Sequence, residues 1–391
     1  MKFLFGAATA AHQIEGNNVH SDWWHYEGKS TGGVSSGLAC NTYLLFKEDR
    51  KCLQEMSCNS YRFSIEWSRI EPSENQFDQQ ALDHYLDVIR DLRKYNIEPI
   101  VTLHHFTNPY WLEKLYQGWE NKKAIDFFER YLKFIIPRLK KLNVKYYITI
   151  NEPNLFVLGK YLGGAWHPYK RNTFTTLRVY NNLAEAHKRA YRLIKDYQPE
   201  AYVAPAIQNM LLYPLHGILY PLNKLLVDIL YFLSNHYFYR KIKNHYDFLG
   251  LNFYSRFYLG LDFKRYGLFK TRPDVVMGDE QMYIQKPEDL KEILHKMKKY
   301  NKPIMITENG FSTNDDPQRA KYMRAIFKVM KTAVNGGVNL IGYQHWSLLD
   351  NFEWAFAWKH KFGLYAFDPK TFKRIAKPSS KVYKELIEEW K

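Results

Sequence analysis

Two short stretches decide the fold of this chain: TINEP at residues 149–153 and ITENG at residues 306–310. Each is an apolar run that ends in a glutamate, Glu152 in the first and Glu308 in the second. A carboxylate at the tip of a buried strand is costly unless the protein needs it there. The two stretches therefore predict one site, built by a fold that brings strand ends together.

Eight runs along the chain have the length and the β-branched or aromatic content of buried strands. Their apolar character is nearly continuous rather than alternating, which is typical of a parallel sheet covered on both faces. The predicted strands are Phe3–Ala11, Ser60–Trp67, Ile97–His105, Lys145–Pro153, Ala201–Gln208, Asp247–Tyr254, Pro303–Gly310 and Leu340–Ser347.

Helical patterns lie between these runs, because apolar residues recur there every three to four positions. The predicted helices are 81–92, 124–139, 176–197, 288–300, 318–334 and 379–390. Strands that alternate with helices eight times predict an α/β fold, a single (β/α)8 TIM barrel over residues 1–391. No glycine-rich phosphate loop follows the first strand, which disfavours dinucleotide binding, and we expect no cofactor.

The composition narrows the class of protein. The formal net charge of +16 comes from Lys and Arg scattered at helical spacing without a long basic run, so we expect solvated helix faces and no nucleic-acid partner. The three cysteines, Cys40, Cys52 and Cys58, have no metal spacing and predict buried, reduced thiols in a cytoplasmic protein. The apolar N-terminal run is too short for a targeting segment, and we interpret it as the first strand.

Residues 210–239, MLLYPLHGILYPLNKLLVDILYFLSNHYFY, are unusually apolar for a connection between strands. His216, Asn223, Lys224 and Asp228 interrupt the run, so it is no clean transmembrane span. Two interpretations stay open. The segment forms helices that pack on the barrel or line the mouth of the site, or it forms a surface for oligomer or peripheral membrane contact.

In a (β/α)8 barrel the catalytic side chains lie at the C-terminal ends of the strands. Tryptophan stacks on the apolar face of a sugar ring, while carboxylates and amides bind its hydroxyl groups. Each residue alone has an ordinary structural explanation, such as a turn or a buried ion pair, so the inference depends on the whole set. That set is Gln13, Glu15, Arg62, Glu66, Arg69, His104, His105, Asn151, Glu152, Asn252, Tyr254, Glu308, Asn309, Trp346, Asp350, Asn351, Glu353 and Trp354.

The motifs around these residues resemble those of the family 1 glycoside hydrolases, the group of β-glucosidases and β-galactosidases. The resemblance extends from the first strand to the last helix, and the short chain is most similar to the archaeal type. The motifs are HQIEG (12–16), YRFSIEWSRI (61–70), LHHFTNPYWL (103–112), TINEP (149–153), LNFY (251–254), ITENG (306–310), HWSLLDNFEW (345–354) and FGLYAFD (362–368).

The resemblance implies that Glu152 is the general acid/base and Glu308 the nucleophile. Arg62, Asn252 and Tyr254 would support the nucleophile. The residues that would bind the sugar are Gln13, His105, Asn151, Trp346, Glu353, Trp354 and Phe362. The resemblance also implies an unphosphorylated sugar, because a carboxylate at Glu353 would repel phosphate, and loops trimmed chiefly at Ser255–Lys286.

The implied reaction is retaining hydrolysis of terminal β-D-glucosides and β-D-galactosides through a covalent glycosyl-enzyme. The aglycone would be hydrophobic or a short oligosaccharide. Retention needs two carboxyl groups roughly 5–5.5 Å apart. We expect Arg62 to lower the pKa of Glu308, and the charge of Glu308 to raise the pKa of Glu152. Two alternatives stay open: a transglycosylase that uses the same intermediate, and a non-catalytic sugar-binding barrel, which the presence of both glutamates disfavours.

Overall fold

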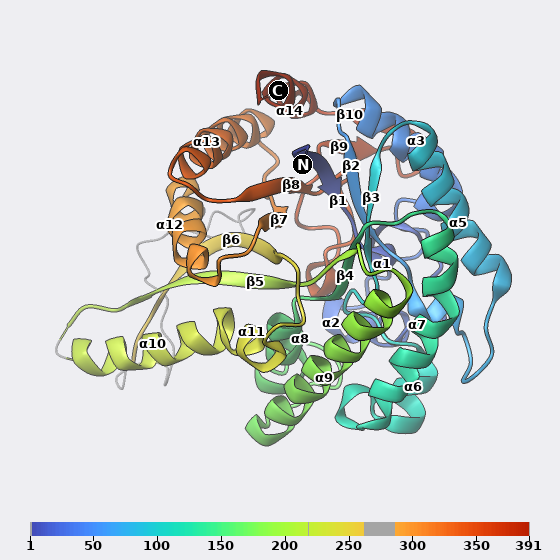
Figure 1. Ribbon diagram of the computed structural model, residues 1–391, viewed down its shortest axis with the longest axis horizontal. Coiled ribbons are helices and arrows are strands. Elements are labelled where there is room, and N and C mark those ends of the chain that lie inside the picture. Colours follow the sequence, from blue (N-terminus) through green and yellow to red (C-terminus); the bar gives the residue numbers. More distant parts are fainter. Residues whose placement is uncertain (1, 218, 262–285, 391) are drawn as a thin grey trace.

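The computed structural model describes residues 2–217, 219–261 and 286–390. Eight parallel strands close into a barrel in chain order, and β8 pairs with β1 (Figure 1). The prediction of a (β/α)8 barrel is therefore confirmed, with a strand at each of the eight predicted runs. The strands are β1 (Leu4–Ala8), β2 (Ser60–Ser64), β3 (Glu98–Thr102), β4 (Tyr146–Asn151), β5 (Tyr202–Pro214), β6 (Leu249–Leu259), β7 (Ile304–Asn309) and β8 (Leu340–Trp346).

Helices connect the strands and cover the outside of the barrel (Figure 1). The longer ones are α2 (Asp22–Thr31), α3 (Thr42–Glu55), α5 (Gln79–Lys94), α6 (Tyr110–Tyr116), α7 (Lys123–Lys141), α9 (Thr173–Tyr197), α10 (Tyr220–Asn235), α11 (Tyr237–Ile242), α12 (Pro287–Met297), α13 (Asp316–Asn335) and α14 (Pro378–Trp390). Short helical turns at the mouth include α1 (Ala11–Ile14), α8 (Pro153–Val157), the π-turn η2 (Leu158–Leu162) and the 3-10 turn η4 (Trp354–Phe356). A two-stranded ribbon, β9 (Tyr365–Phe367) and β10 (Arg374–Ala376), precedes α14.

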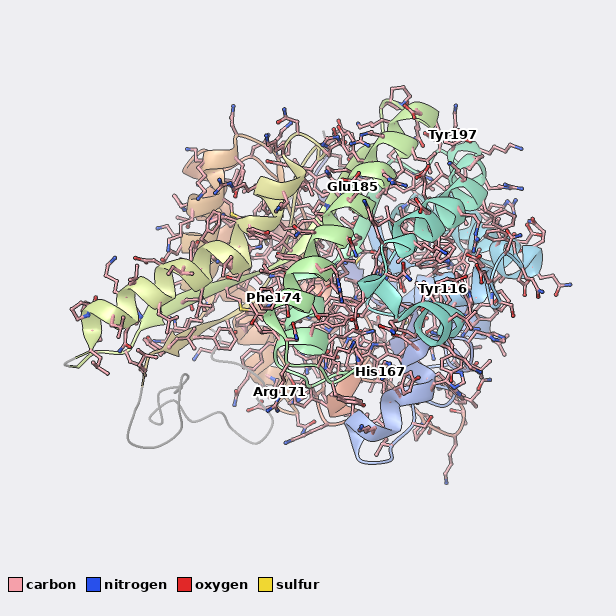
Figure 2. The ribbon with its side chains drawn as sticks, turned by 90° about the horizontal axis from the view of Figure 1, so that it is seen from below. Tyr116, His167, Arg171, Phe174, Glu185 and Tyr197 are labelled. Atoms are coloured by element: carbon pink, nitrogen blue, oxygen red, sulfur yellow. The ribbon has the colours of Figure 1, made fainter. Side chains whose placement is uncertain are left out.

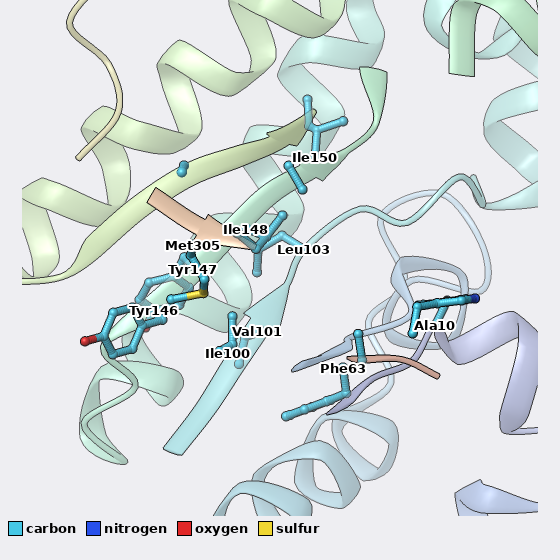
Figure 3. Packing of buried hydrophobic residues seen from close by; sticks show 14 of the residues in the cluster. Ala10, Phe63, Ile100, Val101, Leu103, Tyr146, Tyr147, Ile148, Ile150 and Met305 are labelled. Carbon is cyan, nitrogen blue, oxygen red and sulfur yellow. The ribbon is translucent and has the colours of Figure 1, made fainter. Parts of the chain in front are cut away.

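The barrel core follows from the continuous apolar character of the strands. Ile100 and Val101 on β3, Tyr147 and Ile148 on β4 and Met305 on β7 are fully buried (Figure 3). Successive strand residues point to opposite faces, so neighbours such as Tyr147 and Ile148 pack on different sides of the same wall. Both faces are therefore apolar, one toward the barrel interior and one toward the helices.

The segment 210–239 departs from the prediction at its start. Residues 210–214 are not helical: they continue β5 past the barrel and pair with 256–259 of β6. A helix or strand assignment for a short apolar run depends on its partner, and the extended partner β6 was not evident from the pattern. The rest of the segment forms α10 and α11, and α10 packs against the β5 extension. The packing of helices on the barrel, the first of the two interpretations, is thus confirmed for this part.

Three further expectations concern the surface and the thiols. Cys40, Cys52 and Cys58 are buried and free. Across the described ranges there is no helix long and apolar enough to cross a membrane. Residues 262–285, which include most of the loop expected to be trimmed, lie outside the described residues.

Truncation in the barrel wall should be costly. Ile148 is fully buried on β4, so Ile148→Ala removes apolar contacts and leaves a cavity, and we expect a loss of about 2–5 kcal/mol in the free energy of unfolding. Leu44→Ala, at a side chain 73% exposed on α3, should change it by less than about 0.5 kcal/mol. Chemical denaturation of the two variants measures both, and equal losses would contradict the packing described here.

Candidate active site

The two glutamates lie at the C-terminal mouth of the barrel, on opposite strands. Glu152 directly follows β4 and precedes α8, and its backbone is left-handed, with φ of 42°. Glu308 lies in β7, one residue before the strand ends. Both side chains are buried, with about 4% of each residue exposed. The strand-end arrangement brings them to one site.

A single arginine connects the two strands. The guanidinium of Arg62, from β2, donates from Nη1 to Glu308 Oε1 at 2.5 Å and from Nη2 to Asn151 Oδ1 at 2.5 Å. The same group donates to the Thr307 carbonyl at 3.0 Å and, through Nε, to Thr102 Oγ1 at 3.1 Å. Arg62 is fully buried, so its orientation is fixed by these four partners.

Strand β6 supplies one partner to each glutamate. Tyr254 donates from its hydroxyl to Glu308 Oε2 at 2.8 Å. Asn252 donates from Nδ2 to Glu152 Oε1 at 2.7 Å and to Asn151 Oδ1 at 3.2 Å. Tyr254 thus lies beside Glu308. The amide of Asn252 binds Glu152, and it also lowers the pKa of Glu308 through a hydrogen bond.

Glu152 and Glu308 differ in their electrostatic environment. Burial raises the pKa of Glu152 well above its usual value, and the charge of Glu308 raises it further. Burial also raises the pKa of Glu308, while Arg62 and the Tyr254 hydroxyl act in the opposite direction. The expected net lowering by Arg62 is thus outweighed by burial. Because the cation contacts Glu308 directly, we assign the proton to Glu152 and the negative charge to Glu308.

Gln13 and Glu353 form a polar pair at one side of the mouth. Gln13, on α1, donates from Nε2 to Asn351 Oδ1 at 2.9 Å, the Phe352 carbonyl at 2.9 Å and Glu353 Oε2 at 3.1 Å. Burial, with the charge of Glu308 second, raises the pKa of Glu353 to about 8. Within the described part of the chain, the buried Oε1 of Gln13 has no hydrogen-bond partner, so it can accept from a bound molecule.

His105, after β3, is held as a neutral ring. Burial, and then the nearby Arg62, lower the pKa of His105 well below its usual value. Its Nε2 lies 3.1 Å from Asn151 Nδ2, which is a donor, so the ring proton belongs on Nδ1. Among the described residues Nδ1 has no partner, and it can donate to a substrate hydroxyl.

The aromatic residues expected at the site lie around the same mouth. The ring of His105 lies 5.9 Å from that of Trp346 and 6.1 Å from that of Trp354, both nearly parallel. Phe362 lies 5.9 Å from Tyr254, edge to face. The structure therefore brings every residue proposed from the sequence to one end of the barrel.

An aromatic wall beside Trp354 was not expected. Trp23, on α2, lies 4.7 Å from the Trp354 ring and 5.5 Å from that of Trp166. Trp166 packs against Gly159, where an added Cβ would lie 2.7 Å from its ring. Trp23 lies in the first turn of α2 and Trp166 in an irregular segment, and neither belongs to a predicted strand or helix, so only their residue type could have indicated a role.

A buried ion pair lies behind this wall. Lys160 Nζ lies 2.6 Å from Asp22 Oδ2 and 3.7 Å from Glu113 Oε1, and all three side chains are almost fully buried. Asp22 precedes Trp23, and Lys160 follows Gly159. The pair thus ties α2 to η2 and holds the two tryptophans in place. A lysine inside an apolar run was the available signal for it.

Comparison with known proteins agrees with this geometry. The family model for glycosyl hydrolase family 1 matches residues 1–218 and 233–391. β-Glucosidase A of Thermotoga maritima is 31% identical, over 98% of this chain and 96% of the relative. The structure of a β-glycosidase from Pyrococcus horikoshii has a TM-score of 0.91 at 32% identity, over 98% of this chain and 93% of that one. A β-glucosidase from Thermotoga maritima in complex with glucoimidazole has a TM-score of 0.87 at 29% identity, over 99% and 98%.

The fold and the site together define a glycosyl hydrolase of the β-glucosidase type. The chain belongs to glycosyl hydrolase family 1.

The electrostatic coupling of the two glutamates can be measured directly. Glu308→Gln removes the negative charge that disfavours ionisation of Glu152, so the pKa of Glu152 should fall. NMR titration of ¹³C-labelled glutamate side chains follows this shift, with Glu152→Gln assigning the signal. Glu74→Gln, at the Tyr116 contact outside the mouth, should leave the pKa of Glu152 unchanged. An unchanged value in Glu308→Gln would contradict the coupling.

Proposed function

We propose that the protein hydrolyses terminal, non-reducing β-D-glucosides and β-D-galactosides with retention of anomeric configuration. The observation that carries this proposal is the unequal treatment of the two glutamates. Glu308 is bound by the cation of Arg62 and the hydroxyl of Tyr254, whereas the side-chain partner of Glu152 among the described residues is the neutral amide of Asn252. One carboxylate is prepared for attack and the other carboxyl group holds a proton.

In the first step Glu308 attacks the anomeric carbon while Glu152 gives its proton to the departing glycosidic oxygen. Ester formation removes the charge of Glu308, which lowers the pKa of Glu152. Glu152 then takes a proton from water as the water oxygen attacks the anomeric carbon. The ester bond to Glu308 breaks, which releases the free sugar and restores the carboxylate of Glu308. The same residue acts first as an acid and then as a base.

The free hydrogen-bonding atoms of the mouth support recognition of a sugar with several hydroxyl groups. Gln13 offers an acceptor and His105 a donor on Nδ1, and the carboxyl group of Glu353 lies beside Gln13. Trp346 supplies a ring face for stacking. Relatives named as β-glucosidases support the glucoside, and the galactoside is proposed from the family resemblance.

For the aglycone we propose an alkyl or aryl group or a short oligosaccharide. The wall of Trp23, Trp166 and Phe106 supports this, since the Phe106 ring lies 5.2 Å from Trp166 and 5.1 Å from Trp354. The same wall would favour an alcohol or sugar acceptor over water, so a transglycosylase remains the second candidate. Both glutamates are in place with their partners, which speaks against a non-catalytic barrel.

Three coarser proposals accompany the reaction. Residues 1–391 act as one domain, because β8 pairs with β1 and closes one barrel. The location is cytoplasmic, which the three free cysteines support. Residues 210–239 make a contact outside the chain, which the exposed face of α10 supports.

Stereochemistry tests the proposed reaction. With aryl β-D-glucosides and aryl β-D-galactosides as substrates, ¹H NMR should detect the β-anomer of the free sugar first, because two displacements occur at the same carbon. Initial release of the α-anomer would overturn the retaining assignment. Product analysis with added alkyl alcohol separates hydrolysis from transglycosylation.

Substitution of each of the two glutamates should impair the reaction in a different way. Glu308→Gly should abolish turnover, and azide or formate should restore part of it with an α-configured product, because a small anion can replace the missing nucleophile. Glu152→Ala should slow substrates with poor leaving groups much more than activated aryl glycosides, since only the former need its proton. Equal losses on both substrate types would argue against the acid role. The ratio of kcat/KM values measures this.

A further inference from the structure

Helix α10 is apolar on the side that faces away from the barrel. Its buried residues, Asn223, Val227 and Asn235, lie on one face. The opposite face presents Leu222, Leu225, Ile229 and Leu233, which are 47%, 58%, 48% and 39% exposed. A helix that is apolar all round is normally buried or in contact with lipid. Here no described residue covers the outer face.

A second exposed apolar group lies on the neighbouring elements. It consists of Leu158 and Leu162 on η2 and Phe174 and Leu177 at the start of α9, and Phe174 is 86% exposed (Figure 2). Two contacts join these elements to α10 and α11. Asn154, one turn before Leu158, donates to the carbonyl of Ser234 at 3.1 Å, and Tyr180 of α9 stacks on Tyr237 at 5.3 Å.

We call these eight exposed residues the apolar rim: Leu158, Leu162, Phe174, Leu177, Leu222, Leu225, Ile229 and Leu233. The rim lies on the mouth side of the barrel for two reasons. Helix α10 packs on the part of β5 that extends past the C-terminal end of the barrel, and η2 follows Glu152 by five residues. Figure 1 shows α10 reaching outward along the extension of β5, with α11 between it and α9.

Most of helix α10 lies outside the residues that the family model matches. The family model matches residues 1–218 and 233–391 and leaves out 219–232, which make up most of α10. The match to the family therefore does not depend on the exposed side chains of Leu222, Leu225 and Ile229. Their role has to be sought in this protein itself.

Positive charge borders the apolar rim. Residues 220–244 contain four basic side chains, Lys224, Arg240, Lys241 and Lys243, and one acidic side chain, Asp228. Lys224 pairs with Asp228 at 2.9 Å, which leaves the three exposed cations after α10 without an acidic partner in the described structure. The guanidinium of Arg240 lies 5.9 Å from the ring of Phe232, so charge and apolar surface meet there. Arg171 is exposed beside Phe174 (Figure 2).

We propose that the apolar rim docks onto an anionic lipid bilayer, with the apolar side chains among the acyl chains and Arg171, Arg240, Lys241 and Lys243 at the headgroups. Charge favours this occupant over a second copy of the chain. A symmetric contact through α10 would bring the unpaired cations of two copies together, in a protein of net charge +16. An anionic surface compensates the same cations.

Docking gives the site a substrate class, and this step rests on the proposed glycosidase function. A bilayer against the rim lies next to the mouth, so β-glycosides whose aglycone is an alkyl chain inserted in the membrane reach Glu152 and Glu308 without leaving the lipid. The tryptophan wall of Trp23 and Trp166 then meets the first part of that chain.

Co-sedimentation with vesicles tests the docking. The full chain should bind phosphatidylcholine vesicles that contain phosphatidylglycerol, and bind pure phosphatidylcholine much more weakly. The double variant L225S/I229S should lower the partition coefficient at least about tenfold, because two exposed apolar side chains no longer enter the bilayer. The triple variant R240Q/K241Q/K243Q should lower it about a hundredfold at low salt, and high salt should have the same effect.

Two control variants make the same types of substitution at surface positions outside the apolar rim. L44S/L115S removes two exposed leucines, 73% and 60% exposed, from α3 and α6. K140Q/K141Q/K145Q removes three exposed lysines from the end of α7 and the turn that leads into β4. Both controls should bind vesicles like the unchanged protein. All variants should keep their activity on a small aryl glucoside, so a failure of docking is distinguishable from a failure of the proposed function.

Several outcomes would overturn the proposal. Equal binding to neutral and anionic vesicles, or equal loss in the rim variants and their controls, would remove it. A dimer in sedimentation velocity that L225S/I229S converts to a monomer would assign the rim to a second copy instead. A large fall in Tm for L225S/I229S would show that the chain covers this face itself.

Discussion

The buried contact between Arg62 and Glu308 is the constraint on which the rest of the site depends. A guanidinium excluded from water is tolerated only when its charge is compensated and its donors are satisfied, and here a carboxylate, an amide, a carbonyl and a hydroxyl do this together. These partners come from three strands besides that of Arg62 itself. The barrel must close in the correct register for the charge to be stable, so folding and the arrangement of the site are linked.

The contact also explains why two identical side chains acquire different protonation. Both glutamates are buried, and burial alone would raise the pKa of each. Only Glu308 has a cation in contact. The negative charge therefore resides there, and its presence disfavours a second charge on Glu152. The difference comes from position relative to Arg62, not from residue type.

The fold was largely predictable because a parallel barrel requires continuous apolar strands, and that pattern is visible along the chain. TINEP and ITENG were informative for the same reason, since a charge at the end of such a strand has few structural explanations. The sequence pattern gave less information on which strands and side chains contact one another. The extension of β5 through residues 210–214 depends on the matching extension of β6, and the contact of Asn252 with Glu152 depends on strand register. The tryptophan wall was not predicted, because Trp23 and Trp166 meet only through tertiary structure.

The extended ribbon of β5 and β6 allows the outer helix α10 to change independently of the active site. It carries α10 outside the barrel wall, where none of the side chains that contact Glu152 or Glu308 are located. Residues 219–232 can therefore be altered or replaced without moving an atom that takes part in bond cleavage. The helix is an attachment point at which the same catalyst can be fixed to a solid support, a carrier protein or a different surface.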